Sequence, residues 1–561
     1  MMTIKPLMRI AQKIALALIF CLSLQCGTTQ VKDEEAISQL NAFINEFSSN
    51  DEAGPLISDI SDAHFAQELA KTKSQLNKLR AIVPERLSGD DLIDWKFAQS
   101  ILAGRELELS EMQPWKKNPR VYMEFTRISN VIDRPGNVEN KIKEIETRLA
   151  LVPTQLENGT KQLEEFVPRF QELSLFMAEN GRVLFEKELP MFIDNAGENA
   201  AHLKALNAKA AASLETFIRF LTDELPTKPR GTFAIGEATY NKMLKQQFLT
   251  DYDADSLWKF GWERFNATLA ELVTVAKKID PNKHWKQLAY EIKREYPDPD
   301  KMIEAHQEWV DKAGEHIKSN DLIPIPWPER VYVVPRVEYL RKTSYYGNFS
   351  SAKGLDKDSI FTSEWMINPF EDQWDQQRKD EYLVEHDWGV IIVTAPHETY
   401  GGHHVQGLYQ LHNPRKLRRD NGISIFSEGW GLYNEQLMEE TGFFPNERIH
   451  LRQLQLRLWR DARVIYDVGM HTGRLTYDKA INIMTDQVGF LRWAAQLEVD
   501  ASSARPGYFI GYFMGMSEIL KMRDEYKQKM GDKFSLRDFH ERLLKIGNMP
   551  PSLMREALLA D

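Results

Sequence analysis

Apolar residues recur at the spacing of α-helices through most of the chain. Between about residues 35 and 320, segments such as ENKIKEIETRLALV and DSLWKFGWERFNATLAELVTVAKKI carry apolar side chains at positions i, i+3, i+4 and i+7, which places them on one face of a helix. The same pattern returns after residue 375 and continues to the end. With 561 residues and 42% hydrophobic content, the chain can bury these faces in a large core. We therefore expect a mainly α fold.

The periodicity changes in one short region. RVYVVP (330–335) and SIFTSEWMIN (359–368) are rich in β-branched and aromatic residues, and turn-like YYGNFSSAKGLDKD lies between them. Strands favour such residues, so we expect two or three strands in one small antiparallel sheet, placed before a His-rich segment. Prolines just before the first strand indicate a boundary. We divide the chain into a helical N-terminal region, 35–328, and a sheet plus helical catalytic region, 329–561, which should form one cleft.

The N-terminus has the pattern of an export signal. Lys5, Arg9 and Lys13 form a positively charged start, and the apolar segment IALALIFCLSL (14–24) follows. This segment is too short to span a bilayer comfortably, and its length and flanks are typical of a secretory signal. We therefore expect the protein to be exported to the periplasm.

A cysteine follows the apolar segment, as in lipid-modified bacterial lipoproteins. We assign residues 1–26 to a signal segment with Cys26 as the lipidation site, and residues 27–34 to a polar tether. Gln25 stands where such proteins usually have a small residue, so export without a lipid is the alternative. Gly27, rather than an aspartate, follows the cysteine, and the lipoprotein resemblance then implies the outer membrane. The lipid anchor would be the only membrane contact.

Composition excludes several classes of function. Cys21 and Cys26 are the only cysteines, so the mature body has no disulfide, no thiol nucleophile and no cysteine ligand for zinc. The net charge is −11 and the pI about 5.8, and nothing indicates the basic face of a nucleic-acid-binding protein. The sequence does not indicate an oligomeric state.

One stretch, APHETYGGHHVQ, concentrates residues that bind metals. His397 and His403 are six residues apart, which on a straight helix separates them by about 120° around the axis and about 9 Å along it. His404, at a step of seven, returns to the same face but adds about 10.5 Å of rise. A zinc ion holds its nitrogen ligands at about 2.0–2.1 Å, so neither spacing suits an unbroken helix. Gly401 and Gly402 lie between the histidines, and we expect them to bend the chain back toward His397.

A third ligand is available further along the chain. Glu428, in FSEGWGLYNEQLMEE, lies 25 residues after His403, and a second helix could carry it to the site. Glu398 would point about 100° away from His397 on a helix, so it suits a general base facing an activated water. We favour a zinc site with an open position for water; the alternative is a helix start that is merely polar.

Four stretches together carry a family resemblance. HETYGGHHVQ, SEGWGLYNE, RVIYDVGMH and EVDASSARPGYFIGYFMGMSEILKMR resemble the successive motifs of the domain-of-unknown-function 885 family. These bacterial proteins are helical, often exported, and akin to the gluzincin metallopeptidases, and the resemblance covers most of the mature chain. It implies one Zn²⁺ per chain at His397, His403 and Glu428, with Glu398 as the base. It favours His403 over His404, which is the more variable position.

The resemblance also places Asp467, His471 and Tyr512 near the site. His471 or Tyr512 could donate a hydrogen bond to the oxyanion of a tetrahedral intermediate, although a structural role is open for both. Asp467 precedes His471 by four residues and could orient it on one helical face. Arg463, one turn earlier, could bind a substrate carboxylate, and a buried ion pair is the alternative.

The chain departs from the family pattern at three places. Gly401 stands where the family usually has proline, and Tyr508 stands where glutamine is usual. DASS (500–503) lacks the Arg-Tyr pair often found there. These departures leave the three ligands and the base intact, and they bear on substrate specificity.

The function that these observations favour is an exported zinc metallopeptidase that hydrolyses short peptides with an activated water. One alternative is a catalytically silent lipoprotein with a binding or envelope role, and another is a zinc hydrolase of a different amide or ester. Glu398 argues for an enzyme, since a binding protein does not need it. The strand at 359–368 could pair with an extended peptide through its edge, or be purely structural.

Overall fold

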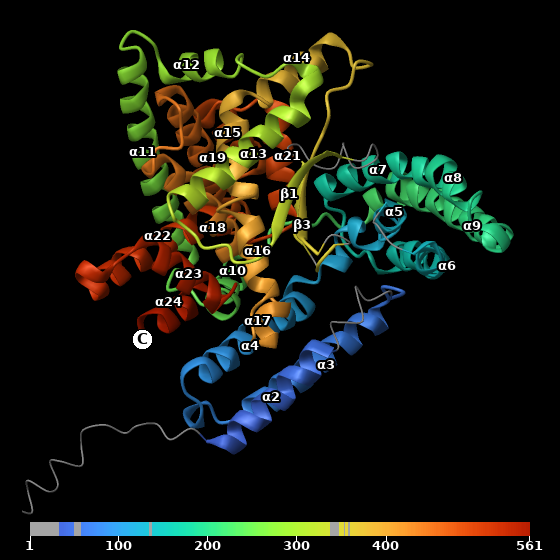
Figure 1. Cartoon of the computed structure of the whole chain (residues 1–561). Helices are drawn as coiled ribbons and strands as arrows, with labels where there is room; N and C mark the ends of the chain where they lie inside the picture. The colour runs from blue at the N-terminus through green and yellow to red at the C-terminus, as the bar shows by residue number, and fades with distance from the viewer. Residues whose placement is uncertain are drawn as a thin grey trace, which may run out of the picture.

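The computed structural model describes most of the chain beyond the N-terminal segment. The described residues are 33–49, 58–133, 137–336, 347–352, 354–356 and 359–560. The predicted signal segment, Cys26 and nearly all of the predicted tether lie outside them. Helices dominate the described residues, which confirms the mainly α fold (Figure 1). Within the same residues, no helix has both the length and the apolar content needed to cross a bilayer.

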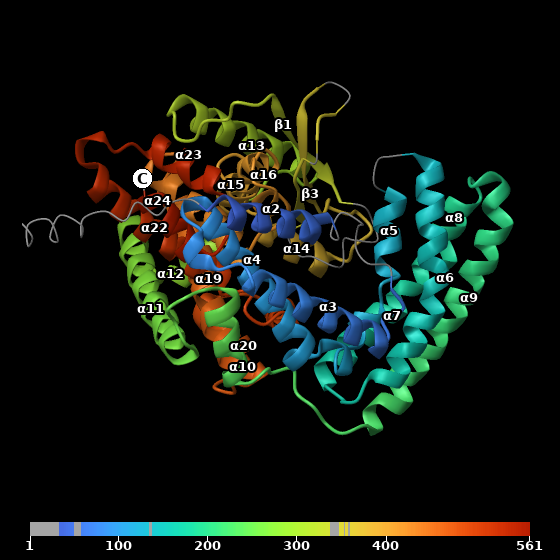
Figure 2. The same cartoon turned by 90° about the horizontal axis from the view of Figure 1, so that it is seen from below.

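The first helices form two distinct parts of the fold. Three run along the lower side of the molecule in Figure 1: α2 (Glu34–Ser49), α3 (Asp62–Arg80) and α4 (Gly89–Leu107). The next five make a helical lobe at the right of Figures 1 and 2, with an apolar core of its own that includes Phe125 and Phe217. The lobe helices are α5 (Thr126–Asp133), α6 (Val138–Gln162), α7 (Pro168–Val183), α8 (Leu189–Ile193) and α9 (Ala200–Arg219).

The remaining helices make the main body of the protein. They are α10 (Glu237–Lys242), α11 (Ala254–Ile279), α12 (Trp285–Ile292), α13 (Met302–Ser319), α14 (Gln376–Glu385), α15 (Trp388–Glu398), α16 (His403–Leu411), α17 (Lys416–Asp420), α18 (Ser424–Glu440), α19 (Glu447–His471), α20 (Tyr477–Asn482), α21 (Arg492–Ser503), α22 (Gly511–Met530), α23 (Leu536–Ile546) and α24 (Pro551–Ala560). Helix α19 is buried along nearly its whole length and packs against α11.

Close packing fixes the position of α18 in this body. The helix lies against α22, and glycines stand where the two backbones meet. A Cβ atom on Gly515 would lie 1.8 Å from the carbonyl oxygen of Ile425, and one on Gly429 would lie 2.5 Å from the Gly515 backbone. Neither glycine can therefore be replaced without separating the helices. This contact holds Glu428 at a defined place.

The sheet has three strands and is mixed. Strands β1 (Glu329–Pro335), β2 (Asn348–Ser350) and β3 (Phe361–Ile367) confirm the predicted strands, in the order β1-β3-β2. The predicted antiparallel sheet is wrong for one pair, because β1 runs parallel to β3 while only β2 is antiparallel to it. Strand β2 precedes β3 closely and pairs with one edge, so β1 is left to pair with the other. Since β3 is central, the outer edges of the sheet belong to β1 and β2.

The predicted division at residue 329 coincides with the first residue of β1. The apolar core nevertheless crosses that point, because one cluster of buried side chains includes Leu40 and Leu76 together with Phe426 and Leu543. The two predicted regions therefore share a core, whereas the lobe has its own.

Candidate metal centre

The helix carrying His397 breaks where the sequence has its two glycines. Helix α15 ends at Glu398, and α16 begins at His403. Gly401 has a φ of 99°, in the left-handed region that glycine adopts without strain. A Cβ atom on Gly402 would lie 1.7 Å from the carbonyl oxygen of His397, so only glycine fits there. The predicted break is confirmed, and it turns α16 back toward the end of α15.

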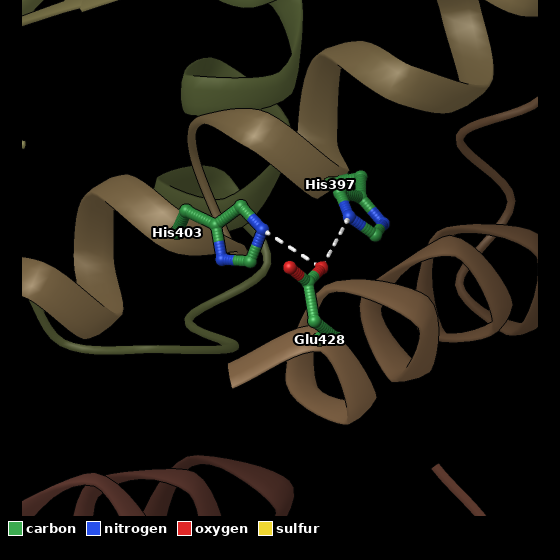
Figure 3. A group of neighbouring side chains, drawn as sticks. All are labelled: His397, His403 and Glu428. Atoms are coloured by element: carbon green, nitrogen blue, oxygen red, sulfur yellow. Dashed lines mark ion pairs between the residues drawn. The ribbon is translucent and has the colours of Figure 1, made fainter. Parts of the chain in front are cut away.

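The break brings three side chains from three helices together. Nε2 of His397 lies 3.8 Å from Oε2 of Glu428, and Nε2 of His403 lies 3.5 Å from the same oxygen (Figure 3). One ligand atom from each residue lies within 4.8 Å of the others. Ligands of a tetrahedral zinc ion at about 2.0–2.1 Å would be about 3.3 Å apart. The donor set and its spacing therefore fit one metal ion.

The electrostatics of this cluster favour positive charge. Burial opposes the charge of His397, but the Glu428 and Glu435 carboxylates outweigh it and raise its pKa to about 9. The pKa of His403 is raised in the same way, against burial, by Glu428. Burial would raise the pKa of Glu428, yet the two imidazoles hold it well below its usual range. The negative charge of Glu428 thus favours protons on the two imidazoles, and a metal cation can replace those protons.

A second carboxylate orients His397 through Nδ1, the ring nitrogen that does not face Glu428. Oε1 of Glu435 accepts a hydrogen bond from Nδ1 of His397 at 2.9 Å and one from Nη2 of Arg460 at 3.2 Å. Nδ1 thus carries a proton that Glu435 accepts, and Nε2 faces Glu428 as the nitrogen that can bind a metal. A Cβ atom on Gly431 would lie 2.6 Å from the imidazole, so this glycine makes room for the ring. Glu435 was not predicted from the sequence, although this residue follows Glu428 by seven positions and so lies on the same helical face.

A tyrosine holds the third ligand. The hydroxyl of Tyr508 donates a hydrogen bond to Oε1 of Glu428 at 2.6 Å, which leaves Oε2 toward the histidines. Burial, and then the charge of Glu428, raises the pKa of Tyr508 above its usual range, so the hydroxyl keeps its proton. The sequence marked Tyr508 only as a departure from the family pattern. Hydrogen bonds of this kind to a metal ligand fix its orientation.

The cluster opens into a cavity of about 810 Å³, which we call the main cavity. Glu398, His403, Glu428 and Tyr512 are among its lining residues. The ring of Tyr512 lies nearly parallel to that of His397, with centroids 6.4 Å apart. Glu398 is half-buried and meets the same space as two of the ligands. The structure therefore brings the predicted base, the predicted ligands and Tyr512 to one site.

Arg463 also lines the main cavity, but it forms an ion pair. Its Nε and Nη2 atoms donate to Oε2 of Glu498 at 3.0 and 2.9 Å, and its guanidinium lies 4.1 Å from the ring centroid of Tyr512. Of the two roles that the sequence left open, the structure shows the buried ion pair. The stacked guanidinium fixes the plane of the Tyr512 ring.

Neither His471 nor Asp467 is among the described residues that line the main cavity. His471 is fully buried, its Nε2 is 3.0 Å from the carbonyl oxygen of Ser502, and its Nδ1 has no hydrogen-bond partner among the described residues. Asp467 instead accepts hydrogen bonds from Tyr240, Ser502 and the backbone N–H of Gly507. It does not orient His471 through a hydrogen bond. Both residues tie the end of α19 to the segment that leads to Tyr508.

His404 faces away from the metal cluster, toward the sheet. Its Nε2 lies 2.9 Å from Oε2 of Glu329 in β1, and its Nδ1 lies 2.9 Å from the hydroxyl of Ser363 in β3. The side chain is fully buried. Of the two adjacent histidines, His403 therefore faces Glu428, and His404 connects α16 to both long strands of the sheet.

Comparison with known proteins defines the family. Residues 50–558 match the family described as bacterial protein of unknown function (DUF885). The chain belongs to the DUF885 family. Comparison of this DUF885 protein with curated proteins gives no match.

Two solved structures, both described as putative lipoproteins, share the fold of this DUF885 protein. The one from Shewanella oneidensis, of unknown function, is 19% identical, with a TM-score of 0.77 over 93% of this chain and 99% of its own. The one from Colwellia psychrerythraea is 18% identical, with a TM-score of 0.72 over 94% of this chain and 96% of its own. At these identities the likeness establishes the fold.

The departures from the DUF885 pattern can now be placed. Gly401 adopts a φ of 99°, which proline, fixed near −65°, cannot adopt. The bend between the ligands therefore follows a path that a proline at position 401 would not allow. At the second of these positions, the hydroxyl of Tyr508 bonds to Glu428. In DASS, Asp500 accepts hydrogen bonds from Arg169 and Tyr477.

Proposed function

We propose that this DUF885 protein is a zinc-dependent peptidase that uses an activated water. The observation that supports it most is the convergence of His397, His403 and Glu428 at the wall of a large cavity. Glu398 lines the same cavity directly beside two of them. Two histidines and one glutamate are the donor set of a hydrolytic zinc site with an open position, and a separate glutamate can serve as its general base.

The residues of the chain would divide the work as follows. When bound, zinc lowers the pKa of a coordinated water toward about 7 and polarises a carbonyl. Glu398 accepts a proton from the attacking water and passes it to the leaving amine. Tyr512 keeps its proton, since burial and the charge of Glu428 raise its pKa well above the usual range, and its hydroxyl can donate to the oxyanion. Glu435 and Tyr508 hold two of the ligands in place.

Metal content and cleavage test this proposal together. The mature protein, loaded with zinc and dialysed, should retain about one zinc ion per chain and should cleave members of a peptide library. Protein without stoichiometric metal would contradict the metal centre. Protein that retains zinc and cleaves no peptide would instead favour a binding role or the hydrolysis of another amide or ester.

We also propose that the protein is exported and anchored to the outer membrane through Cys26. The apolar segment before this cysteine supports the proposal, and two solved structures with the same fold are described as putative lipoproteins. Growth with a labelled fatty acid should mark the wild type and leave Cys26→Ser unlabelled. Equal labelling of the two proteins, or a cytoplasmic location, would contradict the anchor.

A further inference from the structure

Among the described residues, three arginines line the main cavity, and they differ in their partners. Arg463 is neutralised by Glu498. Arg378 stacks on Trp374 and Trp493. Arg505 is exposed, and its guanidinium lies 4.5 Å from the ring centroid of Tyr508. Among the residues that the structure describes, no carboxylate forms an ion pair with Arg505.

The acidic side chains nearest to Arg505 in sequence already have other partners. Glu498 accepts hydrogen bonds from Arg463, Trp459 and Tyr466. Asp500 accepts from Arg169 and from the hydroxyl of Tyr477. Both carboxylates are therefore held by other residues, and Arg505 presents its charge to the cavity.

The surroundings of Arg505 add positive charge. A second cavity of about 390 Å³ adjoins the first, and both Arg505 and Lys117 line it. Burial, and then the charge of Arg505, lowers the pKa of Arg120, while the charge of Asp500 opposes this. The two guanidinium groups thus lie close enough to repel each other. An anion placed against Arg505 relieves this repulsion.

Arg505 is close to the metal centre. Its guanidinium packs on the ring of Tyr508, and the hydroxyl of the same ring bonds to Glu428. The two contacts and the length of a phenol place the guanidinium within about 10 Å of the Glu428 carboxylate. An extended peptide advances about 3.3–3.6 Å per residue. The ion pair itself takes about 3 Å of this distance and leaves about 7 Å, so a carboxylate bound to Arg505 would lie one or two residues beyond the bond that is cut.

We propose that Arg505 binds the free C-terminal carboxylate of the substrate, so that one or two residues are released from the end of a peptide. The planar guanidinium pairs with a carboxylate through two parallel hydrogen bonds. Apolar side chains of the cavity, including Phe176 and Leu497, which are 53% and 45% exposed, can receive the residues that precede the terminus. This inference rests on the proposed function, because it assigns a substrate class to the same site.

Binding to a protein that does not turn over tests the inference directly. The probes are N-acetyl-Ala-Phe-Ala-Ala as the free acid, the same peptide as its amide, and an amide with aspartate in the last position. In zinc-loaded Glu398→Gln protein, calorimetry should show the acid binding about tenfold more tightly than either amide, the effect of one charge-assisted pair in an open cavity. Adding Arg505→Gln should reduce this ratio to about one. Adding Arg378→Gln, an equal change elsewhere in the cavity, should keep it.

Each contrary result has a distinct meaning. No preference for the acid, including no binding of any probe, would overturn the inference. Equal binding of the aspartyl amide would overturn the assignment to the C-terminus, and loss of the preference in Arg378→Gln alone would overturn the choice of Arg505. If wild-type protein cleaves none of the peptides while the preference requires Arg505, the carboxylate site is supported and the proposed hydrolysis fails.

Discussion

Glu398→Gln should lower peptide hydrolysis by about 10²–10⁴-fold while leaving the zinc content unchanged. General base catalysis contributes a factor of this size, and glutamine keeps the size of the side chain but cannot accept the proton. The three ligands are untouched, because Glu398 lies on the cavity wall beside them. The measurement is kcat/KM on any peptide found in the library digest, together with elemental analysis of the same preparation.

A matched control separates this effect from a change of charge. Glu364→Gln makes the same substitution at an exposed position of β3, and it should leave both readings at their wild-type values. Loss of zinc in Glu398→Gln would show that Glu398 is a ligand. Full activity in Glu398→Gln would remove Glu398 from the mechanism. If the protein has no peptidase activity and Glu398→Gln binds a partner as the wild type does, a binding role would fit.

Most of the fold follows from local patterns that a sequence displays. The period of apolar residues fixes the helices, because each helix must bury one face. The composition of RVYVVP and SIFTSEWMIN likewise fixes β1 and β3. The direction of the strands could not be predicted in the same way. It depends on how the chain connects the strands, and β1 is not joined to β3 by a tight hairpin, because β2 comes between them in sequence and pairs with the other edge of β3.

The metal ligands could be predicted because their chemistry narrows the choice. Histidines at a step of six or seven can share one ion only if the chain bends, and Gly401 and Gly402 permit the bend. The residues that support the ligands could not be found this way. Glu435 has an ordinary place in a helix until His397 is known to lie against it, and Tyr508 reaches Glu428 from 80 residues away.

The surroundings of His471 could not be predicted from the sequence. The resemblance places this residue, the last of RVIYDVGMH, near the chemistry, and that role stays a prediction. The structure buries it at the end of α19, where its Nε2 lies 3.0 Å from the carbonyl oxygen of Ser502. Sequence position along a helix gives the face that a residue occupies, but it does not tell which neighbour covers that face. The burial of His471 against the segment that leads to Tyr508 is decided by tertiary packing.

The adjacent histidines should separate metal binding from stability. His403→Ala removes a ligand and should weaken zinc binding by more than about 100-fold, because losing only the hydrogen-bond partner of a ligand costs about 10- to 100-fold. In the metal-free protein Glu428 keeps His397 and Tyr508 as partners, so the unfolding free energy should fall by less than it does for His404→Ala. His404→Ala should keep zinc affinity within about threefold. It should instead lower that free energy by about 2–4 kcal/mol, because Glu329 and Ser363 lose a buried partner.

The loss of stability in His404→Ala should depend on pH. Burial would raise the pKa of Glu329, but hydrogen bonds from His404, Lys318 and Tyr400 lower it to about 2. A carboxylate whose pKa is depressed by folding stabilises the protein above its unfolded pKa, about 4.3, and loses that contribution as the pH falls toward 2. Urea unfolding at pH 7 and pH 3 should therefore show a smaller difference between wild type and His404→Ala at the lower pH. If His404→Ala loses zinc and His403→Ala keeps it, the ligand is His404, and the orientation of the two side chains described above is wrong.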